Sequence, residues 1–169
     1  MSTQRLQLRN VLWLVIAVCL LLTATHTTAL AQADAEEKNR RAVEAGFEKW
    51  RRGTGSIFEL LASDAKCTIV GLSTVSGTYH SRRDFMDMVI IPFNASLSTP
   101  LVPTVQAIYA DGDMVIVLWD GKAIARDGKT YGNTYSWYLK MRDGKIVNAT
   151  AFYDSIAFND LWKRVRPQQ

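Results

Sequence analysis

The chain has 169 residues, of which 48% are hydrophobic, and its 20 basic and 16 acidic side chains give a formal net charge of +4. This length and composition predict one folded domain of ordinary size with its own hydrophobic core. No run of Lys or Arg exceeds two residues, so the sequence predicts no nucleic-acid partner.

The N-terminal segment has the pattern of a secretory signal peptide. Arg5 and Arg9 form a positive flank, and the run from Val11 to Leu22 carries no charged side chain. Ala29-Leu30-Ala31 then supplies the small residues that signal peptidase requires, which places the cut ahead of Gln32.

We therefore expect residues 1–31 to be removed and residues 32–169 to form one exported domain, periplasmic or secreted; a cut after Ala33 is the alternative. The apolar run is shorter than the roughly 20 residues that cross a bilayer, so no stable membrane anchor is expected after cleavage. The remaining chain keeps Cys67 and His80 as its only cysteine and histidine. This pair forms neither a disulfide nor a zinc site, and no cofactor motif is present, so we predict no metal and no cofactor.

The first predicted element is an amphipathic helix over residues 35–52. Its apolar residues Val43, Phe47 and Trp50 recur at steps of four and three, which places them on one helical face. Gly53 is expected to end this helix.

Two Ser-x-x-acid patterns predict the starts of later helices, Ser56 with Glu59 and Ser81 with Asp84. The first opens a short helix over residues 57–62, and Pro92 ends or bends the second. Between them, residues 66–71 are predicted to form a strand, and Gly77 marks a turn.

The second half of the chain is β-rich and is divided by three Asp-Gly turns. This pattern predicts an antiparallel meander of four strands over residues 104–110, 114–125, 130–141 and 145–153. A last helix over residues 156–164 follows, capped by Asp154 or Ser155. Helices followed by an antiparallel sheet make an α+β fold.

Several of these strands are apolar on both faces, as in the segment from Val115 to Trp119. One face of the sheet is expected to meet the helices, and the other also needs cover. We therefore expect a homodimer through the outer sheet face.

The segments with the most characteristic order and spacing lie along positions 38–162: Ala42 to Gly53, Phe58 to Asp64, Gly77 with Ser81 to Phe85, Asp111 to Val115, and Arg142 to Val147 leading to Phe152-Tyr153-Asp154. In this order the chain resembles the NTF2-like superfamily, and within it the SnoaL-like polyketide cyclases and their ketosteroid isomerase relatives. The resemblance implies a curved sheet that wraps the N-terminal helices as a cone, with a pocket at its open end.

The resemblance also implies which catalytic groups are missing. The general-base aspartate of ketosteroid isomerases falls near Val70, and the oxyanion-hole tyrosine corresponds to Phe47, so neither chemical function is kept. The aspartic acid of the oxyanion hole in ketosteroid isomerases falls near Ser136 or Trp137. One carboxylate of the related limonene epoxide hydrolases falls near Ala151. Neither steroid-type isomerisation nor that kind of epoxide hydrolysis is expected.

Asp154 and His80 are the remaining candidates for general acid–base catalysis. The aspartate closes the family's aromatic-aromatic-Asp motif, and the histidine precedes a helix that borders the pocket in relatives. Each has an ordinary alternative, since Asp154 can cap a helix and His80 can lie in a surface turn. Asp120 is expected to point away from the pocket because it alternates with Trp119. Cys67 is expected to be a buried strand residue rather than a nucleophile.

An aromatic wall is predicted for the pocket. Alternation along one strand directs three of its residues to the same face, and helix and strand aromatics complete a surface suited to a flat, mainly apolar ligand held by a few hydrogen bonds. The predicted binding residues are Phe47, Trp50, Tyr79, Trp119, Asn133, Tyr135 and Trp137. Simple core packing is the alternative for all of them.

Three functions are consistent with the sequence. The first is an exported domain that binds a small apolar molecule without transforming it. The second is an isomerase, cyclase or lyase of the same fold, and the third is an accessory module whose pocket is filled and whose sheet face binds a partner.

Overall fold

The computed structural model describes residues 31–165, so the predicted signal peptide lies outside the described residues except for Ala31. The chain divides into two units, Met1–Ala35 and Glu36–Gln169. In the first unit, the described residues 31–35 are helical. Within the described part of the chain, no helix has the length and hydropathy of a membrane span. Every strand that the structure describes, and the buried hydrophobic core, lie in the second unit.

The predicted amphipathic helix is present and extends through residue 52. Val43 and Phe47 are buried and Trp50 is half-buried, as the spacing of apolar residues predicts. The helix ends at Gly53, whose φ of 69° lies in the left-handed region that glycine favours. The Gly53 N–H donates a hydrogen bond to the Trp50 carbonyl at 3.0 Å, which closes the last turn.

The second predicted helix is shorter and tighter than the sequence indicates. It is a 3₁₀ helix, η1 (Ile57–Leu60), in place of an α-helix over residues 57–62. Its start is as predicted, because the Ser56 backbone N–H donates to the Glu59 carboxylate at 3.1 Å.

Strand β1 (Leu61–Ile69) begins five residues before the predicted strand and ends earlier than residue 71. A register shift between Leu61 and Lys66 interrupts the apolar alternation that marks a strand in a sequence. The prediction of a turn at Gly77 is wrong, because this residue opens β2 (Gly77–Tyr79), which pairs antiparallel with β1.

The next helix is continuous but changes type along its length: α2 (Arg82–Phe85), the π-helix η2 (Met86–Ile90) and α3 (Ile91–Ala95). The Ser81 hydroxyl accepts a hydrogen bond from the Asp84 N–H at 3.0 Å, so the predicted start is confirmed. Pro92 does not end the helix; it lies at the start of α3. Since proline has no N–H to donate, the wider π turn directly before it accommodates the missing bond.

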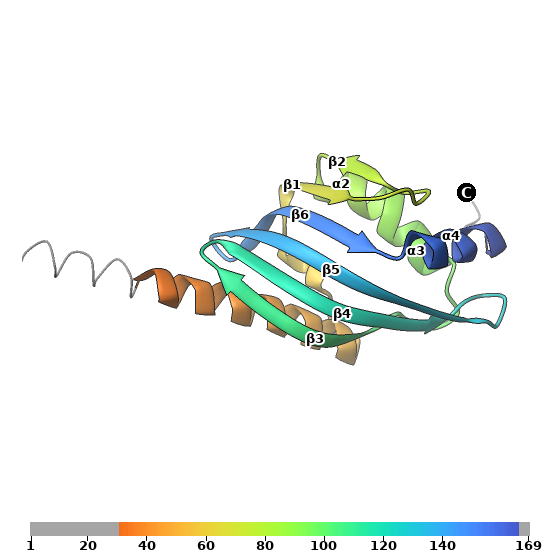
Figure 1. The fold of residues 1–169 in the computed structure, drawn as a ribbon, viewed down its shortest axis with the longest axis horizontal. Helices are drawn as coiled ribbons and strands as arrows, with labels where there is room; N and C mark the ends of the chain where they lie inside the picture. Colours follow the sequence, from red (N-terminus) through yellow and green to blue (C-terminus); the bar gives the residue numbers. More distant parts are fainter. Residues whose placement is uncertain (1–30, 166–169) are drawn as a thin grey trace, which may run out of the picture. The chain divides into compact units, whose positions relative to one another are not determined.

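The predicted four-strand meander is confirmed and closed by a capped helix: β3 (Val102–Asp111), β4 (Met114–Ile124), β5 (Thr130–Arg142), β6 (Lys145–Tyr153) and α4 (Ser155–Arg164). The six strands lie in the order β2-β1-β6-β5-β4-β3 (Figure 1). The β1–β6 pair is parallel and the other neighbours are antiparallel. A bulge between Val105 and Ala107 bends the edge strand β3.

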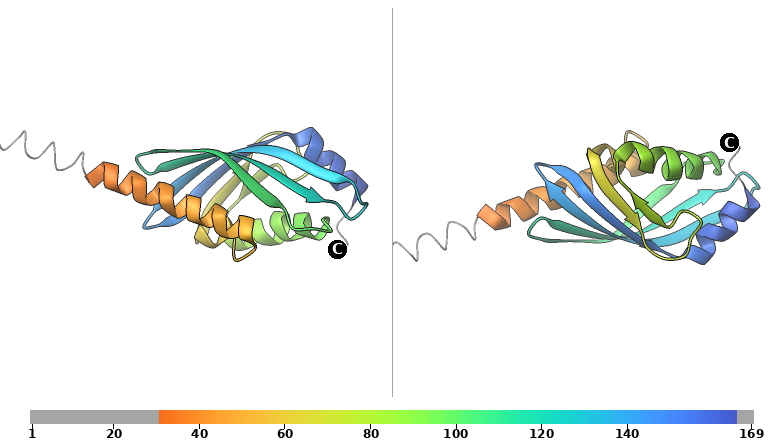
Figure 2. Two further views of the ribbon diagram at one scale, coloured as in Figure 1. Left: turned by 90° about the horizontal axis from the view of Figure 1, so that it is seen from below. Right: turned by 90° about the horizontal axis from the view of Figure 1, so that it is seen from above.

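The fold is the expected α+β cone. The sheet curves, and the helix of residues 36–52 together with α2, η2 and α3 lies on its concave side (Figure 2). Alternation along β4 directs Val115, Val117 and Trp119 to this side, where all three are buried. The concave face and the helices therefore enclose the core that positions the site.

Candidate functional site

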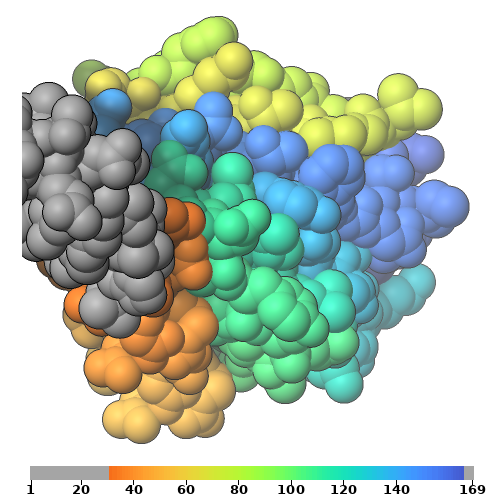
Figure 3. Space-filling model, turned by 60° about the vertical axis from the view of Figure 1, so that its left-hand side comes forward, coloured from red at the N-terminus to blue at the C-terminus, as the bar shows by residue number. Residues whose placement is uncertain are grey.

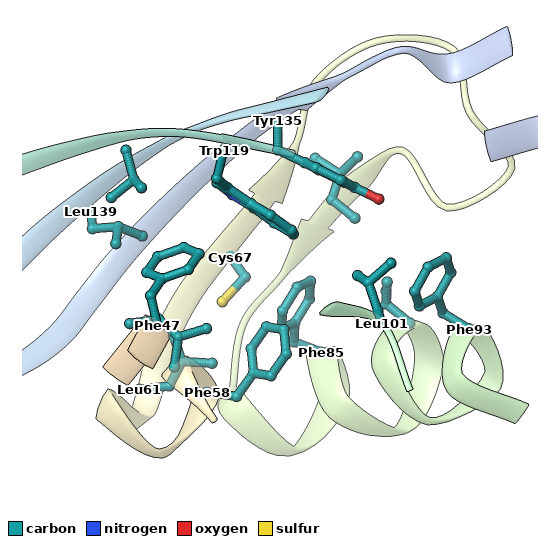
Figure 4. Close-up of a cluster of buried hydrophobic side chains, with 14 of the residues drawn as sticks. Phe47, Phe58, Leu61, Cys67, Phe85, Phe93, Leu101, Trp119, Tyr135 and Leu139 are labelled. Atoms are coloured by element: carbon teal, nitrogen blue, oxygen red, sulfur yellow. The ribbon is translucent and has the colours of Figure 1, made fainter. Parts of the chain in front are cut away.

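A cavity of about 60 Å³ lies between the concave face of the sheet and the helical side of the core. The sheet lines it with Ile69, Trp119, Tyr135, Trp137, Ala151 and Tyr153. The helical side contributes Trp50, Phe58, Phe85, Val89, Ile90 and Phe93. Figure 4 shows Trp119 and Tyr135 above Phe58 and Phe85, with the cluster of buried side chains between sheet and helices.

The aromatic wall on the sheet is built by register. Trp119 of β4 lies directly opposite Tyr135 of β5, and their rings stack with centroids 4.0 Å apart at 8°. The Trp137 ring meets Trp119 edge to face at 4.9 Å and 83°. Phe47 packs against both tryptophans, at 5.5 Å from Trp119 and 5.8 Å from Trp137. The position of each ring is therefore fixed by its neighbours.

Four of the seven predicted binding residues line the cavity: Trp50, Trp119, Tyr135 and Trp137. The other three do not. Phe47 is core packing behind the tryptophans, and the half-buried Tyr79 donates its hydroxyl to the Val75 carbonyl at 2.8 Å. Asn133 is buried at the end of the wall, where it makes structural hydrogen bonds.

Asn133 joins two tyrosines to the end of β6. Its Nδ2 donates to the Tyr131 hydroxyl at 3.1 Å and to the Asp154 carbonyl at 2.9 Å, and its Oδ1 accepts from the Asp154 N–H at 3.0 Å. The Tyr131 and Tyr135 hydroxyls are 2.8 Å apart and share a hydrogen bond. Burial raises the pKa of both phenols above the ordinary value, so they stay neutral hydrogen-bonding groups at physiological pH.

The two predicted catalytic residues lie away from the cavity lining. Asp154 is exposed, and its Oδ1 accepts the Ile156 N–H at 2.8 Å as the N-cap of α4. His80 is exposed directly after β2. These positions fit the structural alternatives, a helix cap and a surface histidine.

Asp120 points to the outer face of the sheet, opposite Trp119, as expected from strand alternation. It accepts hydrogen bonds from the Thr134 hydroxyl and the Gln106 amide, both at 2.6 Å, and these bonds lower the pKa of its carboxyl. Cys67 is buried, and burial raises the pKa of its thiol to about 12. A thiol with this pKa is uncharged at neutral pH and is a poor nucleophile.

Part of the cavity wall was missed by the sequence analysis, although a signal for it exists. Phe85, Val89 and Phe93 recur every four residues and line the cavity from one helix. Helical periodicity relates Phe85 to Val89, but a helix that ends or bends at Pro92, as predicted, separates Phe93 from them. Phe58 and Tyr153 carry no comparable signal.

A protein-family model described as the SnoaL-like domain matches residues 40–149. Among solved structures, Bal32a from a soil-derived mobile gene cassette is 18% identical, with a TM-score of 0.64 over 76% of this chain and 98% of its own. TerC, co-crystallised with polyporic acid, is 19% identical, with a TM-score of 0.61 over 75% and 98%. An NTF2-like protein from Burkholderia thailandensis E264 is 18% identical, with a TM-score of 0.59 over 70% and 93%. No curated protein matches the sequence significantly.

The structural role of Asp154 predicts the effect of two substitutions. Asp154→Ala removes the cap of α4 and should lower the free energy of unfolding by about 1 kcal/mol. Asp154→Asn keeps a capping oxygen and should stay within a few tenths of a kcal/mol of the native protein. Urea denaturation followed by circular dichroism measures both. Equal losses for Ala and Asn would show that the carboxylate has a role other than capping.

Proposed function

The chain belongs to the SnoaL-like domain family, and we propose that it is an exported protein that binds a small, mainly apolar molecule in the cavity between sheet and helices. The lining of this cavity carries the proposal. It is aromatic or aliphatic apart from Asn94 and two tyrosine hydroxyls, and it contains no Asp, Glu, His, Lys or Arg. Such a wall favours an apolar ligand over a charged one.

The position of the acidic and basic side chains favours binding over catalysis. General acid–base chemistry needs a titratable group within hydrogen-bonding reach of the ligand. Asp154 and His80 are both exposed and outside the lining. TerC, which shares the fold, was co-crystallised with polyporic acid, so this fold occurs together with a small organic molecule.

The cavity volume limits the size of the ligand. One water takes up about 10–15 Å³ of such a volume, so 60 Å³ holds about four to six heavy atoms. A second cavity of about 30 Å³ shares Phe58, Phe85 and Trp137 as part of its wall. The main cavity by itself therefore makes a single five- or six-membered ring the natural upper size of the ligand. Open space of this kind favours ligand binding over an accessory module with a filled pocket.

Filling the cavity should abolish binding. Val89 is buried in the lining, whereas its neighbour Met88 is 62% exposed. Native mass spectrometry of protein purified from its own host should detect a retained ligand that Val89→Phe loses and Met88→Phe keeps. Circular dichroism checks that both variants are folded, since overpacking costs about 1–3 kcal/mol. Equal ligand retention by the two variants would place the ligand elsewhere, and bare native protein would count against binding.

We also propose that the outer sheet face forms a homodimer. Tyr109, Tyr138 and Phe152 are 64%, 38% and 43% exposed on this face, and the last two pack edge to face at 5.7 Å. Ile116 and Leu118 add half-buried aliphatic surface. Figure 3 shows β3 to β6 side by side on the surface of the molecule. An exposed aromatic and aliphatic sheet face of this kind fits a second copy of the chain.

Analytical ultracentrifugation tests the dimer. The native protein should sediment as a dimer, and Tyr138→Glu should sediment as a monomer, because it places a charge within the proposed interface. The matched control is Leu72→Glu in the exposed loop before β2, which should remain dimeric. A monomeric native protein would refute the proposal.

Export is tested by the mass of the mature chain. Protein recovered from the periplasm or the medium should have lost residues 1–31 and begin at Gln32, or at Asp34 if the cut follows Ala33. Substituting Ala31 by Arg should block this cleavage and raise the recovered mass. A full-length chain that stays in the cytoplasm would contradict export.

A further inference from the structure

The lining of the cavity reaches the surface of the molecule along one helix. Of the residues that line the cavity, Asn94 of α3 is the only exposed one. Ile90, four residues earlier on the same side of the helix, also lines the cavity and is half-buried. Val89 and Phe93 lie beside them in the lining and are buried. The wall therefore passes from core to surface across η2 and α3.

The end of the cavity at α4 is closed. Phe158 of α4 is buried and stacks on Phe93, with ring centroids 5.7 Å apart at 11°. Tyr153, which also belongs to the lining, shares a hydrogen bond of 2.8 Å between its hydroxyl and that of Ser73 in the loop before β2. These contacts hold α4 and the loop before β2 against the rest of the core.

The sheet and the opposite end are closed as well. Trp119 and Tyr135 lie on neighbouring paired strands, and their rings stack with centroids 4.0 Å apart. At the opposite end the buried Phe58 ring packs against Trp50, with centroids 5.3 Å apart. Figure 4 shows this packing, with Phe93 at the end of the cluster away from Phe58. Within the described part of the chain, the surface-exposed part of the lining is thus on α3.

The helix at this position is held by fewer backbone hydrogen bonds than a regular α-helix. The Ile91 N–H donates to the Met86 carbonyl, five residues earlier, which is the bond of a π turn. Pro92, the next residue, has no N–H to donate. Displacement of α3 from η2 therefore breaks fewer bonds than displacement of a regular helix, and a segment of this kind opens at lower cost.

We propose that the ligand enters and leaves the cavity beside Ile90 and Asn94, and that the Asn94 side chain sets the width of this entrance. This inference rests on the proposed ligand-binding function and adds the route to the binding site. The helices lie on the concave side of the sheet (Figure 2), so the entrance is on the side opposite the outer face. The entrance therefore stays open in the proposed dimer.

Reversible obstruction of the entrance tests this route in residues 32–169, which hold the whole described core. Cys67 is the only cysteine in this part of the chain, and burial raises the pKa of its thiol to about 12, so it does not react with a thiol reagent. Asn94→Cys is modified with 2-(trimethylammonium)ethyl methanethiosulfonate, whose positive charge keeps the label out of an apolar cavity. Met88→Cys is the matched control, because Met88 is on the same helix, 62% exposed and outside the lining.

The probe is benzene, which fits the size limit of the cavity, and NMR line shapes give its Kd and both rate constants. The label on Asn94→Cys should lower the association and dissociation rate constants together by roughly tenfold or more, which corresponds to an added barrier of about 1.4 kcal/mol. The Kd should change little, because a narrower entrance raises the barrier in both directions. Dithiothreitol should restore the rates. Asn94→Ala, with its smaller side chain, should raise both.

The outcomes separate the two proposals. If benzene binds but the label at position 94 leaves both rates unchanged, or slows them no more than the label at position 88, the entrance is wrong and the binding function stands. A change in the dissociation rate alone, with a matching change in Kd, would assign Asn94 to the bound ligand and also overturn the entrance. If benzene does not bind to the folded native protein, both proposals are wrong.

Discussion

The contact between Phe47 and the two sheet tryptophans is the packing on which the rest of the domain depends. Phe47 lies on the helix of residues 36–52, with its ring 5.5 Å from Trp119 and 5.8 Å from Trp137. This contact joins the helix to the concave face of the sheet. It also supports the tryptophan rings from one side, so that they form a rigid wall for the cavity on the other. The same contacts therefore pack the core and hold the cavity wall in position.

The same scaffold supports the proposal of ligand binding over proton transfer, because it lines the cavity with apolar side chains. Ala151, to which the sequence resemblance relates one carboxylate of limonene epoxide hydrolases, lines the cavity with a methyl group. The resemblance places the aspartic acid of the ketosteroid isomerase oxyanion hole near Ser136 or Trp137. Trp137 faces the cavity, and Ser136, the preceding residue of the strand, points to the outer face. Aliphatic and indole groups therefore occupy the inward-facing positions at which the resemblance implies acids in relatives. Asp154, one of the two predicted acid–base residues, has a structural role as the N-cap of α4.

Much of this fold could be predicted from local sequence patterns. The pairing of strands that lie far apart in the sequence could not. The Asp-Gly dipeptides predicted the turns of the meander. In the β5–β6 turn, φ is 51° at Asp143 and 72° at Gly144, a conformation that Asp-Gly sequences favour. The parallel pairing of β1 with β6 joins strands far apart in sequence, and no local pattern records it. For the candidate site, strand alternation predicted the inward-facing side of Trp119, Tyr135 and Trp137, and all three line the cavity. It could not separate a side chain that lines a cavity from one behind it, as with Asn133, because that depends on packing from other elements.

Both edges of the sheet are poor templates for a further strand. At one edge β2 has three residues, and at the other β3 contains Pro103 and the bulge between Val105 and Ala107. A short strand, a residue without an N–H and a distorted ladder all discourage a foreign strand from adding to the sheet. Backbone-directed aggregation is therefore blocked at both ends, although the sheet carries apolar side chains on both of its faces. The proposed dimer would therefore form by side-chain contacts across the sheet face, which depend on shape, and not by strand addition, which does not.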